Sequence, residues 1–139
     1  RVATAGGIAP VTGCKALSRI LTWQRGRFEF LPALPPDSAD GEPLPMYGAL
    51  LEAVQYVDEL ARLDLAPLPP ASPLIRTSEK APGNLSKLAL DVLALVEAGG
   101  TVADVVDAGP GFDSQIYEAL LELLKLRLIE VRPRDFMIV

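Results

Sequence analysis

The sequence predicts an α+β protein made of two small units that a proline-rich linker joins. Two observations favour this organisation. Apolar residues at helical spacing alternate with short strand-like runs in both halves of the 139-residue chain. Five prolines lie within residues 64–83, where a fixed φ and missing N–H groups disfavour regular structure. We therefore expect a first unit at residues 1–63, a linker at 64–83 and a second unit at 84–139.

The first unit is expected to contain a strand at residues 1–5, a helix at 13–24, a strand at 27–31 and a helix at 46–63. The strand at 27–31 alternates apolar and polar residues, as a half-buried strand does. Between it and the second helix, residues 31–45 contain five prolines and are expected to form a loop. The helix at 46–63 gathers its polar residues on one stripe and is apolar over the rest.

The second unit is expected to begin with a helix at residues 85–98 that Asn84 caps and two glycines end. Thr101 opens a short helix, since Asp104 stands at the spacing of a capping box. Asp113 is expected to cap a long helix that continues to about residue 127.

Two short apolar runs, residues 128–131 and 136–139, follow this helix and are expected to pair as a β-hairpin. Three helices and a hairpin, with Ile116, Leu120 and Leu123 leading into the first strand, resemble a winged-helix domain. This resemblance concerns the fold and does not determine a function.

A run in the first unit resembles a bacterial family. Residues 13–17 read G-C-K-A-L, residues 20–23 read I-L-T-W and residues 26–30 read G-R-F-E-F. Their order and spacing are similar to the second half of the PATAN domain, and the resemblance extends over residues 1–63. We expect the chain to be the downstream part of a longer polypeptide. The aromatic residues of the run are expected to pack in a core: Trp23, Phe28 and Phe30.

The resemblance implies a non-catalytic adaptor. PATAN domains occur in bacterial signalling proteins, beside receiver domains or in small-GTPase-linked motility and polarity systems, and are thought to mediate protein contacts. The family has no catalytic residues to transfer to this chain.

Composition argues against catalysis. The chain has no histidine and one cysteine, Cys14, so the usual general base, the commonest metal ligand and any thiolate cluster are missing. Cys14 is expected to be a small apolar filler. The glycine-rich runs lack the spacing of a phosphate-binding loop. We predict no catalytic residue, no metal, no cofactor and a cytoplasmic protein, because unpaired cysteine fits a reducing compartment and no apolar run approaches membrane length.

The negative charge of the chain argues against binding of nucleic acid. The net charge is −5, and residues 84–139 contain five Lys and Arg against nine Asp and Glu, a difference of −4. The polar face of the long helix is also net negative, and only Arg132 and Arg134 make a basic turn. A winged-helix transcription regulator that binds DNA through these arginines is the alternative function.

The long helix of the second unit carries a second apolar stripe besides the one that faces its own core. Its residues are Tyr117, Leu121, Leu124 and Leu128. Either the first unit packs on this stripe, or a partner protein or second copy of the chain does. We therefore predict a bacterial signalling or regulatory adaptor, in a two-component or small-GTPase-linked motility system, that acts through protein contacts at these four residues.

Overall fold

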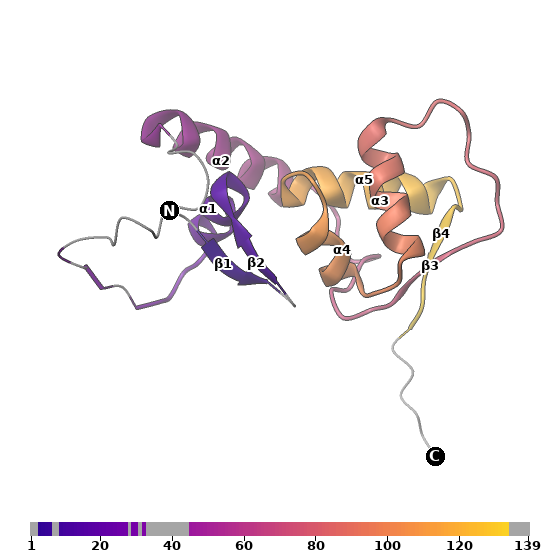
Figure 1. Cartoon of the computed structure of the whole chain (residues 1–139), viewed down its shortest axis with the longest axis horizontal. Helices are drawn as coiled ribbons and strands as arrows, with labels where there is room; N and C mark the ends of the chain where they lie inside the picture. The colour runs from indigo at the N-terminus through magenta and orange to yellow at the C-terminus, as the bar shows by residue number, and fades with distance from the viewer. Residues whose placement is uncertain (1–2, 7–8, 28, 31, 33–44, 134–139) are drawn as a thin grey trace, which may run out of the picture.

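A computed structural model of the chain describes residues 3–6, 9–27, 29–30, 32 and 45–133. The described residues form helices and short strands, which confirms the predicted α+β class. Two units lie side by side, and helix α2 of the first, Met46–Ala61, extends toward helix α5 of the second, Asp113–Lys125 (Figure 1).

The first unit is an antiparallel hairpin followed by two packed helices. Strand β1, Ala3–Gly6, pairs with β2, Ala9–Thr12. The strand at the start of the chain was predicted, whereas β2 was not. Gly13 then turns the chain into helix α1, Gly13–Leu21, with a φ of +68° that favours glycine.

Helices α1 and α2 pack closely because small side chains lie between them. Ala16 of α1 and Ala49 and Ala53 of α2 are all buried. A methyl side chain keeps the helices near to each other but adds little apolar area to a core. The first unit is therefore held by close backbone approach rather than by large interlocking side chains.

The predicted strand at residues 27–31 is not formed at its described residues Arg27, Glu29 and Phe30. The predicted core packing is also wrong for Trp23 and Phe30, whose side chains are 59% and 89% exposed. Phe28 lies outside the described residues. Alternation of apolar and polar residues gives a strand only when another strand is there to pair with it. Here β1 pairs with β2 and not with the described residues of the run 27–31.

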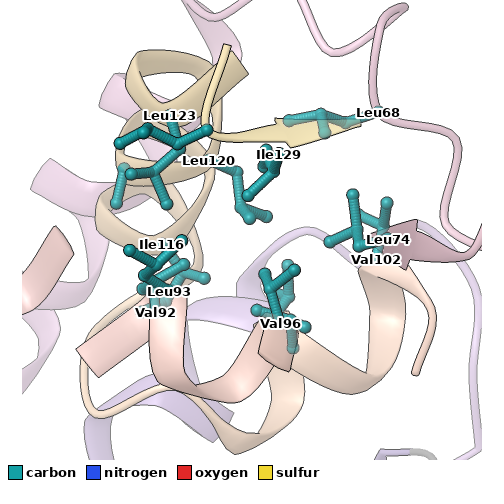
Figure 2. Close-up of a cluster of buried hydrophobic side chains, with 14 residues drawn as sticks. Leu68, Leu74, Val92, Leu93, Val96, Val102, Ile116, Leu120, Leu123 and Ile129 are labelled. Atoms are coloured by element: carbon teal, nitrogen blue, oxygen red, sulfur yellow. The ribbon is translucent and has the colours of Figure 1, made fainter. Parts of the chain in front are cut away.

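The second unit encloses the main hydrophobic core. Its helices are α3, Lys87–Glu97, α4, Val102–Ala108, and α5. Strand β3, Leu74–Arg76, pairs antiparallel with β4, Ile129–Val131. Aliphatic side chains from all three helices and both strands meet in the centre (Figure 2).

Helix boundaries in this unit agree largely with the local sequence signals. The Thr101 hydroxyl accepts from the Asp104 N–H and the Asp104 carboxylate accepts from the Thr101 N–H, which confirms the predicted capping box. The cap of α3 is Ser86 rather than Asn84. Asp113 is the first residue of α5 and not its cap, which leaves its carboxylate available for a contact outside the helix.

The predicted linker at residues 64–83 needs correction. Leu68 and Leu74 are buried in the core of the second unit. The carbonyls of Pro70 and Ser72 accept hydrogen bonds from Ala103 and Val102. Prolines tolerate an extended edge segment as well as a loop, so composition alone did not distinguish the two.

The predicted hairpin of residues 128–131 and 136–139 extends beyond the described residues. Within them, β4 pairs with β3, from the supposed linker, with Ile75 opposite Glu130. Residues 136–139 lie outside the described part of the chain. Strands β3 and β4 are thus more than fifty positions apart, and the long connection between them holds helices α3, α4 and α5.

Candidate interaction site at the junction of the two units

The first turns of α1 contact the end of α4. The Lys15 ammonium donates hydrogen bonds to the carbonyls of Val106, Asp107 and Gly109, at 3.4 Å for Asp107 and 2.9 Å for Gly109. The last carbonyls of a helix have no partner within it, and a cation there is favoured by the helix dipole. Burial lowers the pKa of Lys15, while the carboxylates of Asp113 and Asp107 oppose this effect. Lys15 therefore caps α4 from the other unit.

One turn later, Arg19 contacts two aspartates of the second unit. Its Nε and Nη2 atoms lie 2.7 and 2.9 Å from the two carboxylate oxygens of Asp113. Its Nη1 atom lies 2.7 Å from Oδ1 of Asp107. The hydrogen bond with Asp113 raises the pKa of Arg19 above its ordinary value, so the guanidinium stays charged. We call Lys15, Arg19, Asp107 and Asp113 the junction clasp.

Aromatic stacking joins α2 to the start of α5. The rings of Tyr56 and Phe112 are stacked, with centroids 3.8 Å apart and planes 14° from parallel. The Gln115 amide donates to the Tyr56 hydroxyl at 3.4 Å and accepts from the Phe112 N–H at 3.0 Å. The first turn of α5 is therefore in contact with both helices of the first unit.

A cleft of about 380 Å³ opens beside this stack. We call it the junction cleft. Residues of both units line it, among them Cys14, Glu52, Tyr56, Pro110, Phe112 and Gln115. The junction cleft is shallow and open to solvent, so it can receive one side chain at the surface but does not enclose a ligand.

Cys14 lies half-buried at this cleft. Burial raises the pKa of its thiol, and the nearby Glu52 carboxylate raises it further. Both effects reduce the thiolate that a nucleophile needs. Among the described residues, no group of three or more cysteine, aspartate or glutamate side chains is placed to hold a metal ion.

The stripe predicted to bind a partner is only partly available. Leu128 is 1% exposed and belongs to the core, so it cannot meet a partner here. Tyr117, Leu121 and Leu124 are half-buried against that core. Burial, and to a lesser extent the Asp113 carboxylate, raises the pKa of Tyr117. Since α2 also packs on α5, the N-terminal end of the stripe lies next to the first unit.

The sequence reasoning missed a larger apolar surface on α2. Met46 is 78% exposed and Leu51 is 58% exposed. We call their row the α2 face, and its residues are Met46, Tyr47, Leu50, Leu51 and Val54. The signal was present, because α2 is apolar around most of its circumference.

Comparisons with known proteins identify no relative of this chain. Its sequence matches no protein-family profile, and neither a curated protein nor a solved structure is significantly similar to it. Within the described ranges, none of the helices has the length and apolar character needed to cross a membrane.

Proposed function

We propose that the chain is a non-catalytic adaptor that binds another protein through the α2 face. The observation that carries this proposal is the exposure of five large apolar side chains on one side of a single helix. Soluble monomers seldom expose apolar patches of this kind unless a partner covers them. An adaptor needs such a surface and needs no reactive group.

The spacing of the α2 face suits a helical or flat apolar partner. Met46, Leu50 and Val54 follow one another at four-residue steps, while Tyr47 and Leu51 continue the row beside them. Residues four apart lie on one side of a helix, which gives a continuous strip about two turns long. A neighbouring side of α2, with Ala49 and Ala53, is packed on α1.

The resemblance of residues 1–63 to PATAN domains supports the same class of function. It favours a cytoplasmic role in bacterial signalling, with a two-component or small-GTPase-linked motility system as the setting. The partner is then a signalling protein or a second copy of this chain. The exposed position of Trp23, which belongs to the resembling run, adds an aromatic group to the surface of the first unit.

The proposal is tested by placing a charge on the α2 face. Leu51→Glu should abolish capture of a specific partner, or self-association measured by light scattering, because it leaves a carboxylate facing apolar side chains. Leu90→Glu is the matched control, since it places the same charge on an exposed leucine of α3, away from the α2 face. Association that survives Leu51→Glu, or that Leu90→Glu weakens equally, would contradict the proposal.

DNA binding is the alternative, and the junction gives it little support. In a winged-helix protein the third helix enters the major groove, but the first turn of α5 is held by Arg19 and Tyr56. Titration with duplex DNA at about 50 mM salt, where phosphate contacts are strongest, separates the two functions. Tight binding there would favour the regulator over the adaptor.

A further inference from the structure

We propose that the junction cleft binds a guanidinium group, and that its natural ligand is an arginine side chain of the partner protein. The identity of that partner as a protein rests on the proposed function. The assignment of a guanidinium does not, because it follows from the charges and rings that line the cleft.

Both cations at the junction are already satisfied. Lys15 lines the cleft, but its ammonium has three protons and contacts three carbonyls at the end of α4. Arg19 is held between Asp107 and Asp113. Neither group is available to attract an anionic ligand.

Glu52 supplies the free charge of the cleft. Its side chain lines the cleft and is exposed, and within the described part of the chain it takes part in no ion pair. The carboxylate also lies close enough to Cys14 to raise the pKa of that thiol. The cleft therefore presents a carboxylate that no cation of the junction balances, and it selects a cationic ligand.

The aromatic stack distinguishes a guanidinium from an ammonium. Tyr56 and Phe112 both line the cleft, and both are half-exposed. A guanidinium is planar and weakly hydrated, so it can lie on a ring while it donates two hydrogen bonds to a carboxylate. An ammonium is compact and strongly hydrated and gains less from this arrangement.

Ligand binding at this cleft would also depend on whether the two units are docked. Glu52 and Tyr56 belong to α2 of the first unit, whereas Phe112 precedes α5 of the second. A ligand that needs both walls binds the docked state and not the separated one, so it stabilises the junction by mass action. The cleft thus couples partner binding to the arrangement of the units.

The test is an NMR titration of the intact chain with N-acetyl-L-arginine methylamide. The corresponding citrulline amide, which is neutral but nearly the same shape, and the lysine amide are the comparison ligands. We expect the arginine amide to bind with a dissociation constant on the order of millimolar and to shift the ring signals of Tyr56 and Phe112. The citrulline amide should bind at least about tenfold more weakly, a difference of about 1.4 kcal/mol.

Glu52→Gln should weaken binding of the arginine amide by about tenfold while the remaining spectrum is preserved, because Glu52 is exposed. Asp58→Asn, an exposed carboxylate of the same helix that does not line the cleft, should leave binding unchanged. The proposal would be overturned if the arginine amide shifted no ring signals of Tyr56 and Phe112. It would also be overturned if the citrulline or lysine amide bound equally well, or if Glu52→Gln bound the arginine amide as tightly as the original chain. Since Leu51 is not tested here, failure would leave the adaptor function of the α2 face standing.

Discussion

The two units of the chain contrast in the size of the side chains that they bury. The second unit fills its core with leucine, isoleucine and valine from three helices and two strands (Figure 2). In the described part of the first unit, the buried apolar residues are Val11, Ala16, Ala49 and Ala53. Its larger apolar side chains, such as Met46 and Leu51, face outward instead.

This contrast separates a unit that is stable through its core from one that depends on a neighbour. A fully buried leucine or isoleucine contributes about 1.5–3 kcal/mol, whereas a buried alanine methyl contributes much less. The junction clasp and the stack of Tyr56 on Phe112 compensate for this shortage by binding the first unit to the second. The apolar side chains left outside are then free to bind a partner.

The largest expected effect follows from removing core volume in the second unit. Leu120 is fully buried, so Leu120→Ala should lower the free energy of unfolding by about 2–5 kcal/mol through lost burial and a cavity. Urea unfolding followed by circular dichroism measures this change. The matched substitution in the first unit is Leu51→Ala, which should change stability by less than about 0.5 kcal/mol. Similar losses in the two variants would contradict the contrast between the units.

An intermediate effect is expected from the junction clasp. Arg19→Met leaves the carboxylates of Asp107 and Asp113 without their cation and should cost about 1–2 kcal/mol. Hydrogen exchange should show amides of α1 and α2 losing protection while those of α3 and α5 keep theirs. Arg62→Met, an exposed arginine just after α2, is the control and should change neither set. Uniform loss of protection across both units would show that they unfold as one.

The smallest expected effect concerns the reactivity of Cys14. Because burial and Glu52 raise the pKa of this thiol, less of it is thiolate at pH 8 than in the unfolded chain, and iodoacetamide should modify it more slowly when folded. Glu52→Gln removes the negative neighbour, so the pKa falls and the alkylation rate should rise, by less than about threefold. Mass spectrometry of the modified chain follows the rate. A slower reaction in Glu52→Gln would place the carboxylate away from the thiol.

Local signals in the sequence predicted what is local in the structure. The capping box of Thr101 and Asp104 involves residues three apart, and it forms as predicted. The pairing of β3 with β4 could not be predicted in this way, because Ile75 and Glu130 lie in segments separated by three helices. The composition of a proline-rich run such as residues 67–73 is the same for an exposed linker and for a segment that packs on a core.

The candidate site was hidden for the same reason. Lys15 and Arg19 stand four residues apart on α1, which indicates that they share a face, but nothing nearby in the sequence indicates the aspartates that they contact. The apolar stripe at Tyr117 was recognised from its spacing, yet spacing could not tell that Leu128 turns into the core after α5 ends. Exposure of the α2 face depends on which side α1 covers, which is a property of the fold.

The hydrogen bonds of Lys15 also determine when the first unit can dock during synthesis of the chain. Its acceptor carbonyls at Val106 and Gly109 lie 91 and 94 residues further along the chain. At about 5–20 residues per second, the ribosome needs roughly 5–20 s to make them after Lys15 has been added. During that interval the first unit has neither its clasp nor its stacking ring. A nascent chain stalled before residue 106 should therefore be more sensitive to protease in α1 and α2 than the completed protein.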